Sequence, residues 1–284
     1  MADLVARLRL VELLNSAAHA VLYLLPFVLI VYLCERRAGA DRARYGTIHF
    51  LNDALYTLFY WGGFYNVFVY AALANLLAPH LDFLKLNLLA GLSWPLQLAC
   101  WWVIGDFLTY WLHRLQHRWA LLWAFHSVHH AQQRLNTLTA YRRHPVEKLI
   151  IDFVVFFGII QLVLGIATRQ WLPLTVLMTG FQVLQHAELN WRYGPFERLF
   201  VSPAFHAVHH SIDARYYTKN FGQMLSLWDF LFGTAVEADR PSRTGVEGLD
   251  MAESIPDQLI APLRYLLRGH AVRREPLDTP VPPA

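Results

Sequence analysis

The chain has 284 residues, of which 56% are hydrophobic and 16% are charged, and its mean hydropathy is +0.30. Because about a quarter of the residues of a soluble globular domain are charged, this composition argues against a soluble protein and predicts an integral membrane protein. The net charge of +3 and the position of the basic residues between apolar runs argue against nucleic-acid binding and fit contacts with lipid headgroups. Cys34 and Cys100 both lie in apolar runs, which argues against a disulfide framework or a thiolate metal site.

Five apolar runs predict the membrane-embedded part of the chain. In order, they cover residues 17–34, 54–78, 89–112, 149–166 and 171–187. A membrane-spanning helix needs about 20 residues, with a range of about 17–25, so we expect four or five spanning helices. The fourth and fifth runs are short, and a tight hairpin that does not fully cross is an alternative for this pair. No signal-peptidase site follows the first run, so we interpret it as a retained anchor.

The positions of arginine and lysine predict the orientation of these helices, because cytosolic loops are enriched in basic residues. The loop after the first run, the segment 113–148 and the region after His186 are rich in arginine, whereas the opposite loops hold only Lys85 and Arg169. We therefore expect the histidine-rich segments on the cytosolic side of a membrane. Only three of the 24 basic residues are lysine, which fits a GC-rich bacterial genome and hence a bacterial inner membrane. Five crossings place the N-terminus outside, and an interfacial first segment is the alternative.

Two leucine-rich stretches with arginines at helical spacing, residues 4–14 and 259–267, are predicted to form helices on the membrane surface. Packing of these helices on the cytosolic part of the protein is an equally good alternative. Residues 275–284 contain four prolines, and we expect them to be disordered.

Three short histidine motifs carry most of the chemical information. The pattern HxxHH occurs twice, at residues 126–130 and 206–210, and HxxxH covers residues 113–117. Spacings of three and four residues place side chains on one face of a helix, and neutral imidazole is a common ligand of iron, zinc and copper. A single histidine on an apolar helix is usually a packing residue, but packing does not account for three such motifs near the ends of apolar runs. We therefore predict a metal site with more than one ion.

The composition of the histidine set indicates which metal it holds. No cysteine or carboxylate cluster accompanies it, and eight or more histidines are too many for one ion. Two ions would each receive about four or five nitrogens and keep an open position, whereas structural zinc sites close at four ligands. Open positions on a histidine-bound redox metal suit dioxygen activation. We therefore expect two iron ions, with O2 as co-substrate.

Asp106 lies inside the third apolar run, where an ionisable residue is costly and marks a functional position. Asp106, Tyr110, His113 and His117 are spaced by four, three and four residues and form one helical stripe. A histidine that binds a metal usually donates its second N–H to a carboxylate or a carbonyl, so we expect Asp106 to orient His113 or a neighbouring histidine. A hydrogen bond from a tyrosine or tryptophan of another helix to Asp106 is the alternative.

The ordered motifs resemble those of the fatty acid hydroxylase and sterol desaturase superfamily of membrane di-iron oxygenases. The similar stretch runs from about Asp106 to Thr234 and includes the three motifs, Gln185-His186 and the segment from Asn136 to Glu147. This resemblance implies two metal ions at the cytosolic ends of a helical bundle. The metal ligands that it implies are His113, His117, His126, His129, His130, His186, His206, His209 and His210.

The resemblance also implies roles for residues around the ligands. Some members of the superfamily have a histidine four residues after the third motif, where this chain has Asn190. We expect Asn190 to act through a bound water or not at all. Asn136, Arg142 and Asp229 are expected to surround the ligands or to order nearby loops. His144 lies outside the ligand motifs, and we expect a structural or gating role for it.

Together these observations predict an all-α integral membrane bundle with a cytosolic histidine-rich helical cap that holds a dinuclear metal site. The predicted parts are N-terminal anchor helices over 1–88, a catalytic domain over 89–236 and a C-terminal tail with an interfacial helix over 237–284. The resemblance implies hydroxylation, or else desaturation, of a lipid such as a fatty acyl or alkyl chain or a sterol. Electrons are expected from a separate donor such as a ferredoxin, cytochrome b5 or a reductase.

Three alternative functions remain open at this point. A carotenoid hydroxylase or ketolase uses similar histidine motifs on a polyene. A haem-carrying electron-transfer protein, which is not an enzyme, needs histidine pairs that face each other across spans. A metal transporter places its ligands near the bilayer midplane, whereas these histidines lie at the ends of apolar runs.

Overall fold

The computed structural model describes residues 10–166, 172–246 and 254–267. The predictions for residues 4–9 and 275–284 lie outside the described residues. As predicted, the described chain is built from helices. It contains no strand, and its β-type contact is an isolated bridge between Ser211 and Thr244.

The longer elements are α2 (Leu10–His19), η1 (Ala20–Leu24), α3 (Leu25–Arg37), α4 (Ile48–Trp61), η3 (Tyr65–Tyr70), α5 (Ala71–Leu77), α6 (Trp94–Arg118), α7 (Ala120–His130), α8 (Pro145–Ile150), η7 (Ile151–Val163), α9 (Leu172–His186), α10 (Pro203–His209), α11 (Leu227–Leu231) and α12 (Ile255–Leu267). Single 3-10 turns are η2 (Arg42–Gly46), η4 (Ala78–His80), η5 (Asp82–Leu84), η6 (Thr139–Tyr141), η9 (Gly194–Arg198) and η10 (Ala214–Tyr216).

In the described part of the chain, one helix is long and apolar enough to cross a membrane. It runs over Val11–Arg37, is 27 residues long and combines α2, the π-helical turn η1 and α3. Few of its side chains are buried in the protein, and Leu22, Leu29 and Leu33 are exposed. This helix contains the first predicted apolar run.

The other apolar runs differ from the continuous spans that hydropathy predicts. The second run is divided where the chain turns at Gly62 and Gly63, between α4 and η3. Gly63 has a φ of +96°, which glycine adopts readily, and a Cβ on Gly62 would lie 2.3 Å from the carbonyl oxygen of Leu58. α6 has 25 residues but carries polar and charged side chains in its second half, and α9 has 15 residues. The number of membrane crossings therefore stays a prediction.

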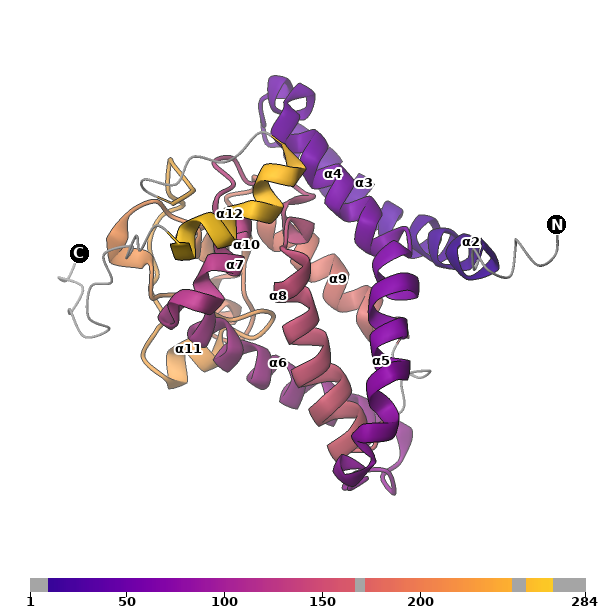
Figure 1. Ribbon diagram of the computed structural model, residues 1–284. Coiled ribbons are helices and arrows are strands. Elements are labelled where there is room, and N and C mark those ends of the chain that lie inside the picture. The colour runs from indigo at the N-terminus through magenta and orange to yellow at the C-terminus, as the bar shows by residue number, and fades with distance from the viewer. Residues whose placement is uncertain (1–9, 167–171, 247–253, 268–284) are drawn as a thin grey trace.

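The longer helices and several shorter ones occupy different parts of the molecule (Figure 1). α5, α6 and the continuous pair α8–η7 extend toward the lower end of the view, and α7, α10, α11 and α12 gather in its left half (Figure 1). α6 joins the two parts, since it packs against both η7 and α7. α9 packs against α3 and α10. These contacts bring the ends of α6 and α9 to the same region of the molecule.

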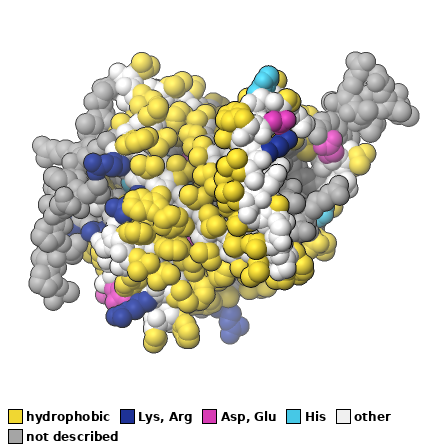
Figure 2. Space-filling view, turned by 90° about the horizontal axis from the view of Figure 1, so that it is seen from below, with side chains coloured by type: hydrophobic (Ala, Val, Ile, Leu, Met, Phe, Trp, Pro, Cys, Tyr) yellow, Lys and Arg dark blue, Asp and Glu magenta, His cyan; other side chains and the backbone are white. Residues whose placement is uncertain are grey.

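The lower face of the molecule is covered mainly by hydrophobic side chains and shows few charged ones (Figure 2). The segment between α5 and α6 lies at this end (Figure 1) and exposes 73% of Phe83, 58% of Leu86 and 63% of Leu88. A large exposed apolar surface marks a contact with a membrane or another protein. This face therefore suits the interior of a bilayer.

Candidate metal centre

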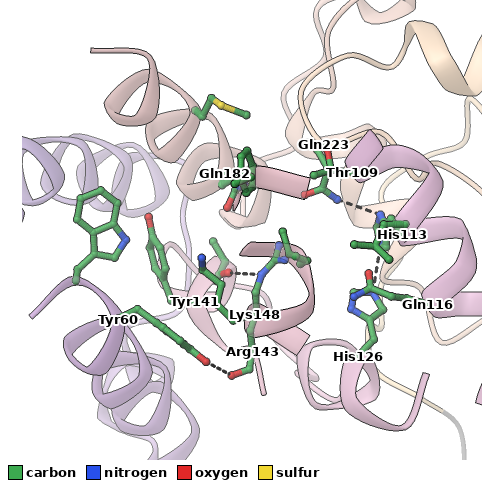
Figure 3. A pocket seen from close by; sticks show the side chains of 16 residues that line it. Tyr60, Thr109, His113, Gln116, His126, Tyr141, Arg143, Lys148, Gln182 and Gln223 are labelled. Atoms are coloured by element: carbon green, nitrogen blue, oxygen red, sulfur yellow. Dashed lines mark hydrogen bonds between the residues drawn. The ribbon is translucent and has the colours of Figure 1, made fainter. Parts of the chain in front are cut away.

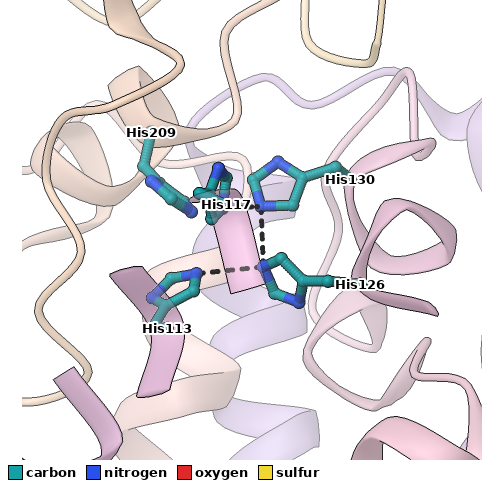
Figure 4. A group of neighbouring side chains, drawn as sticks. All are labelled: His113, His117, His126, His130 and His209. Atoms are coloured by element: carbon teal, nitrogen blue, oxygen red, sulfur yellow. Dashed lines mark hydrogen bonds between the residues drawn. The ribbon is translucent and has the colours of Figure 1, made fainter. Parts of the chain in front are cut away.

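All nine histidines expected as ligands come together in two groups. Within each group, the ring nitrogens of its members lie within 4.8 Å of one another. The first group, shown in Figure 4, consists of His113, His117, His126, His130 and His209. The second group consists of His129, His186, His206 and His210. The groups adjoin, because the rings of His130 and His210 stack with their centroids 4.4 Å apart.

Each HxxHH motif contributes to both groups. In α7, the first and last histidines of the motif, His126 and His130, are four residues apart and share a helix face that points into the first group. The middle histidine, His129, points into the second group. The motif of α10 does the reverse: its first and last histidines join the second group, and its middle one joins the first. Each metal group is thus built from both motifs, with two histidines from one motif and one histidine from the other.

The residues at the N-terminus of α10, the helix that carries the second HxxHH motif, favour the start of a helix. The Ser202 hydroxyl accepts a hydrogen bond from the N–H of Phe205 at 3.1 Å, and Pro203 occupies the first turn of α10. A serine cap followed by proline is a favourable helix start. α10 is short and fully buried, so this cap fixes the position of its two histidines, His206 and His209, and of His210 directly after it.

In the second group, ring hydrogen bonds determine which nitrogens present lone pairs. His129 Nδ1 lies 3.1 Å from the carbonyl oxygen of Arg142, and His186 Nδ1 lies 2.8 Å from that of Gln182. A carbonyl oxygen only accepts, so each Nδ1 carries the proton and each Nε2 presents a lone pair. These two Nε2 atoms are 3.2 Å apart. Two facing lone pairs repel each other unless a cation binds both.

The first group has the same arrangement. His113 Nδ1 lies 2.8 Å from the carbonyl oxygen of Phe221, and His126 Nδ1 lies 2.9 Å from Oε1 of Glu147. Both oxygens accept the ring proton, and the Nε2 atoms of His113 and His126 then face each other at 3.0 Å. His209 donates from Nδ1 to the carbonyl oxygen of Lys219 at 2.8 Å, which leaves its buried Nε2 without a hydrogen-bond partner among the described residues. A metal ion would satisfy all three nitrogens.

Burial keeps these histidines in the neutral form that binds metals. It lowers the pKa of His129, His130 and His210 well below the ordinary value of 6.5, and neighbouring rings lower it further. Burial also lowers the pKa of His209 to about 3. The rings therefore stay uncharged at neutral pH, with their lone pairs available. A donor set of neutral imidazoles fits iron, zinc or copper.

Glu147 supports the first group, a role that was not predicted from the sequence. Its buried carboxylate accepts the hydrogen bond from His126 and lies 3.6 Å from Nη1 of Arg143. Burial by itself would raise the pKa of Glu147, but His126 and Arg143 outweigh it, so the pKa lies below its ordinary value and the carboxylate is ionised. The signal in the sequence was a lone acid in the first turn of an apolar helix, shortly after His144 and Pro145.

Asp106 does not orient a histidine directly, contrary to the prediction. Its buried carboxylate accepts hydrogen bonds from the N–H groups of Met224 at 2.9 Å and Leu225 at 3.1 Å, and from Nε1 of Trp228 at 2.8 Å. Asp106 lies two turns before His113 on α6, which is roughly 10 Å along the helix axis, so the shared stripe does not bring the two side chains together. The alternative, a bond from a tryptophan of another helix, is what the structure shows.

Asp106 instead acts on the loop that follows Asn220. Asp229 holds the same loop, because its carboxylate accepts hydrogen bonds from the N–H groups of Phe221 and Gly222, each at 2.8 Å. Burial raises the pKa of Asp229 to about 6. Since the carbonyl oxygen of Phe221 accepts from His113, the two aspartates position a first-group ligand through the backbone.

A second buried network supports His129. Arg142 donates from Nε to Oδ1 of Asp53 at 2.6 Å, and Asn136 donates from Nδ2 to Oδ2 of Asp53 at 2.8 Å. Arg142 also donates from Nη1 to Gln258 of α12 at 3.0 Å. The carbonyl oxygen of Arg142 then accepts from His129. Sequence reasoning missed Asp53, because its partners lie more than 75 residues away along the chain.

Asn190 and His144 lie outside the two groups. Asn190 is exposed on the segment after α9 ends at His186, so the helical spacing that would bring it toward the ligands does not apply. The expectation that Asn190 acts through a bound water or not at all therefore stays a prediction. His144 caps α8 by accepting the N–H of Val146 at Nδ1, and its Nε2 donates to the carbonyl oxygen of Leu259 in α12. α12 also packs against α7. The stretch 259–267, which lies in α12, therefore follows the alternative of a helix packed on the protein.

A cavity of about 130 Å³ borders the first group (Figure 3). His113 and His126 form part of one wall, and Tyr60, Tyr141 and Arg143 lie across from them (Figure 3). The complete lining is Tyr60, Trp61, Thr109, Leu112, His113, Gln116, His126, Ala140, Tyr141, Arg143, Lys148, Ile151, Phe156, Met178, Gln182 and Gln223. A molecule bound here would lie against the histidines of the first group.

Comparisons with known proteins agree with this site. Residues 98–234 match the fatty acid hydroxylase family. The chain is 32% identical over 191 residues to ornithine lipid hydroxylase OlsE of Rhizobium tropici, which covers 66% of this chain and 56% of the relative. It is 31% identical over 129 residues to alkylglycerol monooxygenase of Homo sapiens, with coverage of 45% and 28%. Methylsterol monooxygenase 2-2 of Arabidopsis thaliana is 32% identical over 145 residues, with coverage of 49% and 52%.

The matches have clear bounds. The chain spans about half the length of the ornithine lipid and methylsterol enzymes and less than a third of the alkylglycerol enzyme. No solved structure matches the chain. The matched segment contains all nine grouped histidines and both aspartates that hold the loop at Phe221. Through residues 98–234, the chain belongs to the fatty acid hydroxylase family.

Proposed function

We propose that this chain is an O2-dependent, non-haem di-iron oxygenase that hydroxylates a lipid. Each histidine group would hold one iron ion. The observation that carries the proposal is the pair of facing Nε2 lone pairs in each group, one pair of which borders a cavity. Bound iron would supply the dioxygen activation that oxidation of an unactivated C–H bond requires.

The residues of the chain prepare the site for this chemistry. Hydrogen bonds to Glu147 and to backbone carbonyl oxygens fix the ring orientation of the ligands before a metal binds. All four histidines of the second group are buried, so bulk water is kept from the centre and side reactions of a reactive oxidant are limited. Leu112, Ile151 and Phe156 line the cavity and would contact the apolar part of a substrate.

Two features support a lipid as the substrate. The relatives are named for ornithine lipid, alkylglycerol and methylsterol, and the protein has an apolar lower face and one helix suited to crossing a membrane. We rank hydroxylation before desaturation, because these relatives are named hydroxylases and monooxygenases. Desaturation and carotenoid oxidation are outcomes that product analysis distinguishes.

The cellular setting is part of the same proposal. We place the protein in a bacterial inner membrane with the histidine groups on the cytosolic side, on the basis of the arginine-rich loops next to the motifs. A separate protein, such as a ferredoxin, cytochrome b5 or a reductase, would supply the electrons.

Haem-based electron transfer is the weaker alternative. A haem inserts a flat macrocycle between two histidines. Here each facing pair is surrounded by further histidines, since every group packs four or five ring nitrogens within 4.8 Å. This crowding suits a single ion and not a macrocycle.

Metal analysis and product analysis test the proposal together. Purified protein should contain about two irons per chain and show no Soret band. Cells that express the protein under ¹⁸O2 should gain a lipid carrying one labelled oxygen atom, and cells that express His129→Ala should not. Loss of two hydrogens without added oxygen would indicate desaturation. An iron-loaded, reducible protein that changes no lipid would contradict the oxygenase proposal.

A further inference from the structure

The cavity beside the first group has a mostly apolar surface that several polar side chains also reach. Apart from the histidines, its lining includes two cations, three glutamine side chains, a threonine and two tyrosines. An acyl or alkyl chain gains nothing from these groups, because burying polar atoms without hydrogen bonds is costly. Tyr60, Thr109 and Lys148 already have partners within the protein, so a polar part of the substrate would serve the polar groups that have none.

Arg143 is the cation of the lining whose side chain can still donate hydrogen bonds to a ligand. Its backbone is held by the Tyr60 hydroxyl, which donates to the carbonyl oxygen of Arg143 at 2.8 Å, and its Nε donates to Ala140 at 3.2 Å. Nη1 is 3.6 Å from Oε1 of Glu147, an oxygen that already accepts from His126. Among the described residues, nothing accepts a hydrogen bond from the two Nη atoms. A guanidinium in this state is a ready partner for a carboxylate or phosphate.

Lys148, the second cation of the lining, differs in this respect. Its Nζ lies 2.5 and 2.6 Å from the two carboxylate oxygens of Asp152, so its charge is already balanced within the protein. Arg143 has the ionised Glu147 carboxylate at 3.6 Å, but its two Nη atoms donate no hydrogen bond to the described residues, so they remain able to bind a ligand. Metal ions bound by the nearby histidines would add positive charge, and an anion in the cavity would offset that charge.

Gln116 provides an independent sign of a ligand. Its side chain is only 3% exposed and lines the cavity next to His113 and His126 (Figure 3). Within the described part of the chain its amide has no hydrogen-bond partner, although buried amides are normally paired. A bound polar group would satisfy it.

The size of the cavity limits what enters. An engineered cavity of about 150 Å³ holds benzene, so about 130 Å³ accommodates a group of a few heavy atoms and not a whole lipid. A headgroup bound here lies against the first histidine group, because His113 and His126 are part of the same wall.

We propose, on the basis of the lipid oxygenase function above, that Arg143 and Gln116 bind an anionic headgroup of the substrate, a carboxylate or a phosphate. Arg143 pairs with the anion, and the Gln116 amide forms a hydrogen bond to the same headgroup. The carbon that is oxidised then belongs to the headgroup or to the first few carbons attached to it, and not to the far end of the chain.

Equilibrium binding of three matched lipids to the purified metal-loaded protein tests this proposal. Dihexanoylglycerol is neutral, its phosphate ester is dihexanoyl phosphatidic acid, and its succinate monoester carries a carboxylate. Calorimetric titration below the micelle concentration should show at least one anionic lipid binding about 10-fold or more tightly than the neutral one. The tighter of the two anionic lipids identifies the group that the cavity selects.

Variants assign the preference to residues. Arg143→Gln should weaken binding of the anionic lipid by about 10- to 100-fold, since a hydrogen bond to a charged group contributes about 1.5–3 kcal/mol. Binding of the neutral lipid should change less than about 2-fold. Gln116→Leu should weaken anion binding by about 5-fold. Arg118→Gln removes an exposed cation from the end of the same helix as Gln116 and should leave the preference unchanged.

Equal binding of neutral and anionic lipids by the wild-type protein would overturn the proposal. So would a folded Arg143→Gln protein that keeps the full preference, with folding checked by its unfolding temperature. If Arg143→Gln does not fold, Arg143→Lys replaces it, and loss of the bidentate geometry should still weaken anion binding. A clear anion preference in a protein that oxidises no lipid would contradict the proposed function and leave headgroup binding standing.

Discussion

The two histidine groups use the same ligand type but have different surroundings. The first group borders the cavity through His113 and His126, and one of its rings is held by the carboxylate of Glu147. In the second group, His129 and His186 are held by backbone carbonyl oxygens. None of the four histidines of the second group is among the residues that line the described cavity.

This difference indicates a division of labour between two sites with similar ligands. A substrate in the cavity meets the first group, so changes around that group should affect substrate oxidation as well as metal binding. The second group is enclosed, and its supports are main-chain carbonyl oxygens, one of which belongs to Arg142 and is fixed by Asp53. Changes there should act mainly through metal retention.

Removal of a ligand should have the largest effect. His126→Ala and His129→Ala each delete a nitrogen that no neighbouring side chain replaces, and we expect oxygenase activity to fall by more than about 100-fold in both. Iron content, measured by mass spectrometry of the purified proteins, should fall by about one ion per chain in each variant. Full activity and full iron content in both variants would contradict the assignment of the two groups.

Glu147→Gln should distinguish the groups more sharply. The amide cannot accept from His126 with the strength of a carboxylate, and loss of such a partner typically costs about 10- to 100-fold in metal affinity or activity. We expect the loss at one of the two sites only, visible as a biphasic cobalt titration followed by visible absorption. Glu237→Gln, which changes an exposed glutamate outside both groups, is the matched control. Equal weakening of both sites would show that the groups do not act separately.

The nine histidines were predictable because a ligand motif is a local pattern. Spacings of three and four residues were enough to place His126 and His130 on one face. The division into two groups was not predictable, because it depends on how α6, α7, α9 and α10 pack. Asp106 was misassigned for a related reason: its spacing relates it only to residues of its own helix, whereas its partners lie on a loop about 120 residues later.

The apolar runs show the same limit. Hydropathy located the first helix, but it did not register the turn at Gly62 and Gly63 that divides the second run. Asp53 and Glu147 were missed because a single acid has no local pattern. Both are recognisable only from their buried partners, Arg142 and His126.

Asp106→Asn and Asp53→Asn should have intermediate effects, each at a different metal site. Asp106 holds the loop that presents the Phe221 carbonyl to His113, so its amide variant should weaken metal binding at the first site by about 10-fold. Asp53 fixes Arg142, whose carbonyl accepts from His129, so Asp53→Asn should weaken the second site by a similar factor. The two cobalt phases provide the measurement. The same phase responding to both substitutions would contradict the separate supports.

Substitution of Asn190 should have the smallest effect and tests the outer limit of the site. Some members of the superfamily carry a histidine at the corresponding position, which makes Asn190→His the informative change. Asn190 is exposed on the segment that follows α9, whereas the ligand His186 is buried at the end of that helix. A histidine at 190 therefore starts outside both groups and gains a metal only if the segment rearranges. We expect iron content and activity within about 2-fold of wild type for Asn190→His and Asn190→Ala, since surface substitutions usually shift free energies by less than about 0.5 kcal/mol. A rise in metal affinity for Asn190→His alone would show that the segment after α9 folds inward when metal binds, and the second group would then be open to a fifth ligand.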